Sequence, residues 1–237
     1  FNMIKYFLLT VLFLGLVANV HAQEWSIGAK GGLLVGTHPN KRPLLSYQGS
    51  VFYERMGAWQ AEGTRRLGFV AQLGYHRRGA SYNAGTFNST NFVIVNDIFH
   101  NLSLAALIKG AYRTKNLIPY YAGGLRMDVT VGRRVVNPFE GQGVTPINVG
   151  FWLGGGLEFN PPKLPVGFLV ELNICPDITP QIFFAQGTQV QYFDPFTQTS
   201  SVRVINQEYR VINISLEVSV GVKFFGQRTT EELPVEE

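Results

Sequence analysis

The chain has 237 residues and a net charge of +4, and only 15% of its side chains are charged, against roughly 25% in soluble proteins. The 20 basic residues form no block interleaved with aromatics, which argues against a nucleic-acid surface. Cys175 has no second cysteine to pair with, which excludes an internal disulfide. No internal apolar run approaches the ~18 residues of a membrane helix, which excludes a helical membrane protein. The 26 glycines and 18 phenylalanines suit a β-structure whose outer face meets lipid.

The N-terminal segment has the pattern of an export signal. Lys5 supplies a positive charge, residues 6–18 form an apolar stretch, and Val20-His21-Ala22 is a small-x-Ala cleavage site. We therefore predict a signal peptide over residues 1–22, with Gln23 as the first mature residue. The alternative is an uncleaved anchor helix, for which the apolar stretch is short.

An alternation of apolar and polar residues dominates from Trp25 onward. It predicts segments of about the ~9–11 residues that a tilted membrane strand needs. The expected strands are 25–36, 47–56, 67–78, 98–112, 119–132, 147–159, 166–177 and 208–225. The predicted fold is all-β, an eight-stranded antiparallel up-and-down transmembrane β-barrel over residues 23–225. An acidic tail, 226–237, follows in the periplasm.

The polar face of these strands is rich in glycine, serine, alanine and asparagine, which suits a narrow barrel interior. It also carries five charges of each sign. We predict that they form a charge network in the lumen, because paired charges can be satisfied in a polar interior. The network comprises Lys30, Arg78, Lys109, Arg126 and Lys223 against Glu54, Asp128, Glu158, Glu171 and Glu217. The alternative is a soluble carrier barrel, with these charges on an ordinary solvated face and the apolar side chains inside.

The connections alternate in length. Short periplasmic turns are expected at 57–66, 113–118 and 160–165, and long outer loops at 37–46, 79–97, 133–146 and 178–207. Aromatic residues near the strand ends, among them Trp25, Tyr53, Tyr75 and Tyr120, suit the girdles that such barrels place at the two membrane surfaces.

Several segments resemble the PorT-like outer-membrane β-barrel family of Bacteroidota. Residues 101–110 (NLSLAALIKG) and 119–125 (PYYAGGL) look like two adjoining family strands. Residues 150–159 resemble its glycine-rich strand, and 212–225 resemble its closing strand with Gly-x-Lys-Phe. Ser103 and Ala105 depart from the acid and proline often found there. The resemblance implies an eight-stranded outer-membrane barrel, and some family members are tied to type IX secretion and gliding.

Catalysis finds little support in the sequence. His38, His76 and His100, with Ser81 and Ser103 nearby, are expected near the outer rim, but no motif such as G-x-S-x-G joins them. We expect no catalytic residue, no metal and no cofactor.

Two outer surfaces are candidates for binding. Basic residues at the outer strand ends could pair with lipopolysaccharide phosphates: Lys41, Arg42, Arg77, Arg78, Arg133 and Arg134. The alternative is that they are solvated loop charges. The last outer loop carries a set of aromatics that could bind a partner: Phe183, Phe184, Tyr192, Phe193 and Phe196. Alternatively, this loop extends the last two strands or folds over the mouth.

The sequence thus predicts a non-enzymatic barrel in the outer membrane of a Gram-negative bacterium. It would act as a structural or interaction component of the envelope, and one such role is that of a subunit of a secretion-type complex. Its partners would be outer-membrane lipid, lipopolysaccharide and envelope proteins, with no nucleic acid. The alternatives are a narrow channel or transporter, and a lipid A-modifying enzyme.

Overall fold

The computed structural model describes residues 22–38, 41–60, 64–84, 93–114, 117–135, 141–161, 164–194 and 199–227. The main sheet consists of long strands: β1 (Ala22–Thr37), β2 (Arg42–Gly57), β3 (Arg65–Ala84), β4 (Val93–Tyr112), β5 (Ile118–Arg134), β6 (Ile147–Phe159), β7 (Val166–Pro176) and β12 (Ile214–Gln227). Short strands lie between β7 and β12: β8 (Ile182–Phe184), β9 (Gln189–Asp194), β10 (Thr199–Val204) and β11 (Tyr209–Val211).

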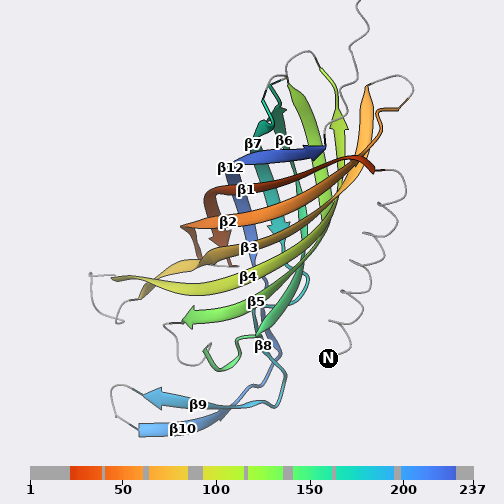
Figure 1. Ribbon diagram of the computed structural model, residues 1–237. Helices are drawn as coiled ribbons and strands as arrows, with labels where there is room; N and C mark the ends of the chain where they lie inside the picture. Colours follow the sequence, from red (N-terminus) through yellow and green to blue (C-terminus); the bar gives the residue numbers. More distant parts are fainter. Residues whose placement is uncertain are drawn as a thin grey trace, which may run out of the picture.

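The long strands form a closed antiparallel barrel in which each strand pairs with its neighbours along the chain (Figure 1). The barrel closes where β1 pairs with β12, from Trp25 opposite Gln227 to Thr37 opposite Ile214. At this seam the backbones approach closely: a Cβ on Gly32 would lie 1.9 Å from the Val218 carbonyl oxygen. The predicted eight-stranded antiparallel barrel is confirmed.

The alternation that predicted the strands is reproduced in their burial. Along β7, for example, inward residues are buried and outward residues are exposed in strict turn. Because side chains on a strand point to opposite faces with period two, this pattern separates a filled interior from an outer wall. Among the described residues, no helix is long and apolar enough to cross a membrane.

Several strand boundaries differ from the prediction. The outer loop expected over 37–46 is reduced to 38–41, because β2 already begins at Arg42. β3 and β4 extend as a paired ribbon to Ala84 and Val93, beyond the predicted 78 and 98. The last strand was expected to run unbroken from 208, but residues 209–211 pair with β8 instead, because Val211 packs into an apolar cluster with Ile182 and Phe184.

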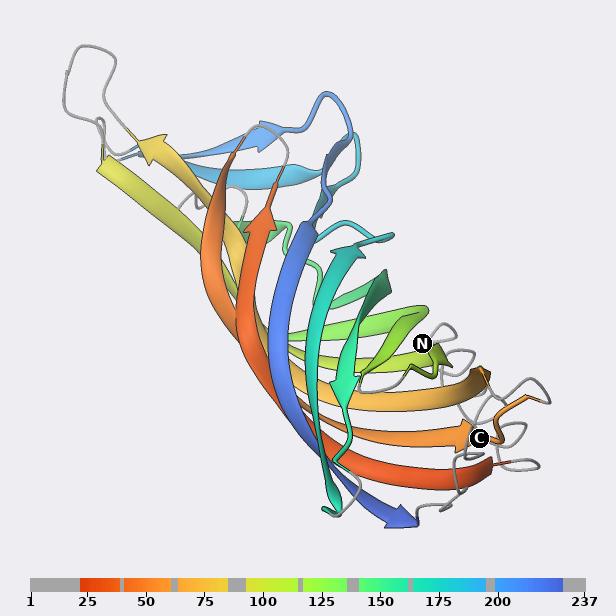
Figure 2. The ribbon, with the colours of Figure 1, turned by 90° about the horizontal axis from the view of Figure 1, so that it is seen from above.

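The two ends of the barrel differ. The connections 58–64, 113–117 and 160–165 lie at the end where β1 begins and β12 ends. The opposite end carries the β3–β4 ribbon and the segment from β8 to β11, and Figure 2 shows β9 and β10 extending beyond the barrel wall there. We call this opposite end the mouth. Of the predicted signal peptide only Ala22 is described, and residues 228–237 of the predicted tail also lie outside the described part.

Candidate functional site: the filled lumen and the mouth

The outer wall of the barrel is apolar and exposed. Outward residues on the strands retain about half of their accessible surface, for example Leu33 (58%), Leu73 (56%) and Val220 (61%). Soluble monomers rarely expose contiguous apolar patches above a few hundred Å². A wall of this kind around a whole barrel is what a lipid environment requires.

Aromatic side chains cluster on this wall toward both ends. Trp25 stacks near Tyr53 with ring centroids 6.5 Å apart, at the end where β1 begins. Toward the mouth, the ring centroids of Tyr75 and Tyr47 are 6.2 Å apart. The Tyr75 hydroxyl lies 2.5 Å from Nδ1 of His100. The girdle prediction is wrong for Tyr120, which points into the lumen and is buried.

The lumen nearest the short connections is closed by a ring of four charges, which we call the lower ring: Glu54, Lys109, Glu158 and Lys223. Lys109 Nζ lies 2.5 Å from Glu54 and also pairs with Glu158. Lys223 Nζ lies 2.6 Å from Glu158 and 3.1 Å from Glu54. Each cation therefore contacts both carboxylates, and the ring is neutral. All four side chains are buried, so the pairing compensates for the loss of hydration.

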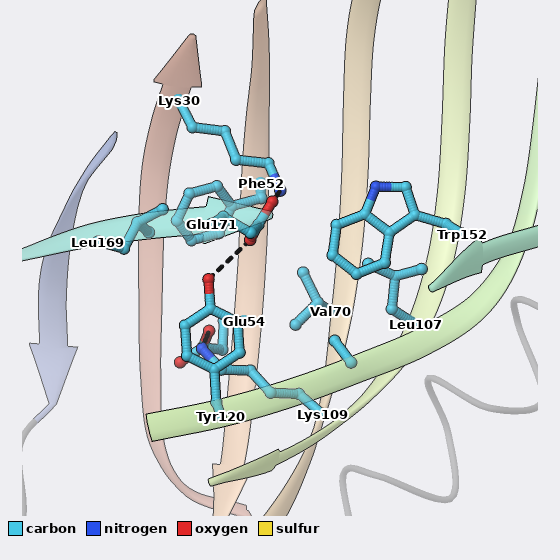
Figure 3. Close-up of a pocket in the computed structure, with 11 residues that line it drawn as sticks. Lys30, Phe52, Glu54, Val70, Leu107, Lys109, Tyr120, Trp152, Leu169 and Glu171 are labelled. Carbon is cyan, nitrogen blue, oxygen red and sulfur yellow. Dashed lines mark hydrogen bonds and ion pairs between the residues drawn. The ribbon is translucent and has the colours of Figure 1, made fainter. Parts of the chain in front are cut away.

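A second pair crosses the middle of the lumen. Lys30 pairs with Glu171, which also accepts hydrogen bonds from the Tyr120 hydroxyl (2.7 Å) and the Asn173 amide (2.7 Å). Lys30 Nζ lies 4.9 Å from the ring centroid of Trp152. Figure 3 shows these side chains pointing from different strands into one space, with the Tyr120 hydroxyl directed at Glu171.

Apolar side chains fill the lumen between the charged groups. They belong to one buried cluster: Phe52, Val70, Ala105, Leu107, Ala122, Trp152, Leu169 and Cys175. The cavity left between this cluster, the lower ring and Glu171 holds about 20 Å³, room for about one water molecule. An eight-stranded barrel is just wide enough for side chains to fill, and the described side chains in this part of the lumen leave little more than that small cavity.

A third group of charges lies under the mouth, and we call it the mouth cluster: Arg78, Arg126, Asp128, Asp177 and Glu217. Arg78 contacts both carboxylate oxygens of Asp177 at 2.9 Å. Arg126 lies 3.1 Å from both Asp177 and Asp128, and 3.3 Å from Glu217. Planar guanidinium groups suit such forked contacts with carboxylates.

The chain after β7 folds over this cluster. The buried Gln181 accepts a hydrogen bond from Arg78 (2.8 Å) and donates one to Thr130 (3.2 Å). Its backbone bonds Val211 and Thr145. Above it, Ile182 and Phe184 pack with Phe99, Val190 and Val211. The segment therefore caps the mouth with an apolar layer over a charged one.

The structure brings together all ten residues of the predicted lumen charge network: Lys30, Glu54, Arg78, Lys109, Arg126, Asp128, Glu158, Glu171, Glu217 and Lys223. Each is buried and lies within ion-pair distance of another member or of Asp177. Sequence reasoning missed Asp177, Gln181 and Tyr120. Asp177 ended a predicted strand and could have been counted by the same alternation, whereas Gln181 lies in a loop whose folding the alternation does not predict.

The basic residues proposed for lipopolysaccharide contact differ in how far they are exposed. Arg42, Arg133 and Arg134, at the mouth ends of β2 and β5, are exposed, and Arg77 in β3 is half-buried. Lys41 is half-buried and pairs with Asp97 at 2.8 Å. Arg78 corrects the prediction: it is wholly buried in the mouth cluster and cannot reach a lipid phosphate.

The aromatics of the last loop are also divided. Phe184 is buried in the mouth cap, so its predicted exposure is wrong, because β8 turns its side chain toward Phe99 and Val211. Phe183 is half-buried with Arg210 over its ring. The backbone of Tyr192 and Phe193 forms part of β9, while Phe196 lies outside the described residues. Of the alternatives left open, folding over the mouth holds for residues 178–184.

The candidate catalytic histidines do not form a site. His38 and His76 are buried, and His100 lies on the outer wall against Tyr75. Burial, with Lys41 and Arg78 nearby, lowers the pKa of His38 to about 3. Ser103 lies in the lumen, and Ser81 donates to Asn96 at 2.7 Å. The described part of the chain contains no group of three His, Cys, Asp or Glu side chains that could hold a metal ion.

Comparisons with known proteins yield distant likenesses only. No protein-family model and no curated protein matches the chain. Among solved structures, the attachment invasion locus protein Ail of Yersinia pestis, in complex with the heparin analogue sucrose octasulfate, is similar at 11% identity and a TM-score of 0.40, covering 85% of this chain and 98% of Ail. The outer membrane protease OmpT from Escherichia coli is similar at 11% identity and a TM-score of 0.39, covering 86% of this chain and 97% of OmpT. Outer membrane protein W of E. coli is similar at 11% identity and a TM-score of 0.31, covering 86% of this chain and 100% of its own. The identification of this chain as a closed eight-stranded barrel rests on its own strand pairing.

Proposed function

We propose that this protein is an integral β-barrel of a Gram-negative outer membrane that acts as a non-enzymatic scaffold and presents an interaction surface at its mouth. The observation that carries the proposal is the contrast between the two faces of one sheet. The outward face is exposed and apolar, whereas the inward face is filled by paired charges and packed side chains. A soluble carrier barrel would reverse this arrangement, with its apolar residues inside.

The filled lumen argues against the two alternative functions. Ions cannot pass three buried layers of paired charge without breaking them. Among the described residues, the histidines, serines and carboxylates that could perform catalysis are buried or separated from one another. What remains is a rigid wall that carries the β3–β4 ribbon and the segment from β8 to β11. Loops held on a rigid scaffold are where binding residues concentrate.

This role fits a component of an envelope complex, including one of the secretion type. With the mouth facing outward, Arg42, Arg77, Arg133 and Arg134 lie at the outer rim, where arginine can pair with lipopolysaccharide phosphates. Changing these four residues to Gln should reduce the lipopolysaccharide that co-purifies. Changing the exposed Arg65, at the opposite end of the barrel, should not.

The main test is the behaviour of the full chain in membranes. After expression, the protein should fractionate with the outer membrane and resist extraction by carbonate. Unheated samples should migrate differently from boiled ones on gels, because a closed barrel resists unfolding by detergent. Recovery as a soluble periplasmic protein would overturn the proposal.

A further inference from the structure

The outward face of the barrel wall carries no charged side chain along most of its height. At the seam, for example, every outward residue is apolar or glycine from Ile27 to Val35 in β1 and from Ile214 to Phe224 in β12. The other described strands repeat this pattern: no Asp, Glu, Lys, Arg or His takes an outward position within 45–53, 67–75, 102–112, 119–131, 147–159 or 166–176. In the proposed function, this apolar band is the part of the wall that meets the membrane core.

On β3 and β4 the apolar band ends at two basic residues. Leu73 and Leu102 are its last aliphatic side chains before the mouth, exposed at 56% and 47%. The next outward positions toward the mouth are Tyr75 and Arg77 in β3 and His100 in β4. The change from aliphatic to basic side chains therefore falls on the same level in both strands.

The strand register places Arg77 and His100 side by side on the outside. They are direct cross-strand partners, and such partners have Cβ atoms roughly 5 Å apart on one face of the sheet. Their neighbours along the chain are all buried on the inward face: His76, Arg78, Phe99 and Asn101. Because side chains alternate between the two faces of a strand, Arg77 and His100 both point outward.

Both side chains have donor groups left for a ligand. The Tyr75 hydroxyl lies 2.5 Å from Nδ1 of His100, which holds the imidazole and leaves Nε2 as the nitrogen that can bond a ligand. On its other side His100 lies opposite Gly132, so no β5 side chain stands beside the ring there. Arg77 has no ion pair or side-chain hydrogen bond within the described part of the chain.

This arrangement matches the phosphate of a lipid head group. A guanidinium binds phosphate oxygens through two parallel hydrogen bonds, and an imidazole N–H beside it can donate to a further oxygen. Lipid phosphates lie at the edge of the membrane core, where the apolar band ends. The exposed ring of Tyr47 lies beside Tyr75 at this level, and amphipathic rings are favoured there. The band below the site favours a phosphate attached to acyl chains over a free phosphate ion.

We propose that Arg77 and His100 together bind one phosphate of lipopolysaccharide on the outer wall, with Tyr75 as the residue that positions the imidazole. This inference rests on the proposed function, which places the mouth at the outer leaflet, and deepens it. It adds His100, selects Arg77 among the basic residues near the mouth, and excludes Arg133. Arg133 lies directly opposite the inward Phe99 and therefore belongs to the other face of the sheet.

The test titrates the full-length protein in detergent micelles with diphosphoryl lipid A, the membrane anchor of lipopolysaccharide, and measures the bound lipid by native mass spectrometry. Arg77→Gln and His100→Gln should each weaken binding about tenfold, because each removes a hydrogen bond to a charged group. The matched control Arg133→Gln removes the same charge from the other face and should bind within about twofold of wild type. Tyr75→Phe should weaken binding in the wild-type background but cause no further loss in the His100→Gln background, since it acts through the imidazole.

The same lipid stripped of both phosphates should bind wild type about tenfold more weakly, and inorganic phosphate at equal concentration should not displace lipid A. Equal binding of the two lipids overturns the proposal, as does an Arg133→Gln loss as large as that of Arg77→Gln. Displacement by inorganic phosphate overturns the choice of a lipid. If a variant does not fold, the comparison of the two lipids on wild type decides the question. Wild type that shows the gel shift of a closed barrel but binds no lipid A removes this inference and leaves the scaffold proposal standing.

Discussion

Replacing Lys109 by methionine tests whether the lower ring stabilises the barrel. Methionine has a similar length and no charge, so the change removes the two contacts of Lys109, to Glu54 at 2.5 Å and to Glu158. Both carboxylates would then share Lys223 alone, in a buried site. Removing one partner of a buried ion pair costs ~3–5 kcal/mol, because the other charge is left uncompensated. We expect the free energy of unfolding to fall by about that amount.

The measurement is equilibrium unfolding in urea in detergent micelles, followed by tryptophan fluorescence. The matched control is the double variant Lys109→Met/Glu158→Gln, which removes one charge of each sign and leaves Glu54 paired with Lys223 at 3.1 Å. This variant should recover roughly half of the loss or more, because no unpaired charge remains. A loss below ~1 kcal/mol in the single variant would refute the reasoning that the ring is a buried, mutually dependent unit.

Three further outcomes follow from the site. In planar bilayers the wild type should show no steady ionic current, because the space beside Trp152 holds about one water molecule; a persistent conductance would support the channel alternative instead. Tyr120→Phe removes the hydrogen bond to Glu171 and should lower the free energy of unfolding by ~1.5–3 kcal/mol, with no effect if that hydroxyl is not bonded. The pKa of His38 falls from 6.5 to about 3 on folding. As the pH falls, the imidazole of the unfolded protein is therefore protonated at a higher pH than that of the folded protein. Stability should be constant above pH ~6.5 and decline toward pH 3, by ~2 kcal/mol at pH 5. His38→Gln should remove that part of the pH dependence, and an unchanged pH profile would contradict the burial of a neutral imidazole.

The barrel and much of its interior could be predicted from the sequence because both depend on a local rule. Side chains alternate between faces along each strand, so Lys30, Lys109 and Glu158 could be assigned to the lumen without knowing which of them meet. A different criterion, nearness to a strand end, misplaced Tyr120 in a girdle and assigned Arg78 to the lipid surface as well as to the lumen, although both residues are buried in phase with the inward face. Which cation contacts which carboxylate depends on strand register and barrel closure, and these link residues far apart in the chain.

The closed mouth was beyond the reach of the alternation. Residues 178–184 belong to a loop, and their path follows from the fit of Gln181 to Arg78 and of Phe184 to Phe99, contacts that no local pattern encodes. Gln142, from another loop, bonds the backbone of Gln191 in β9, and this contact too links segments far apart in the chain. Strand positions and inward faces were therefore determined by the sequence itself, through the period of two. The ion-pair partners and the mouth cap were decided only by the tertiary structure, because each arises where separate segments meet.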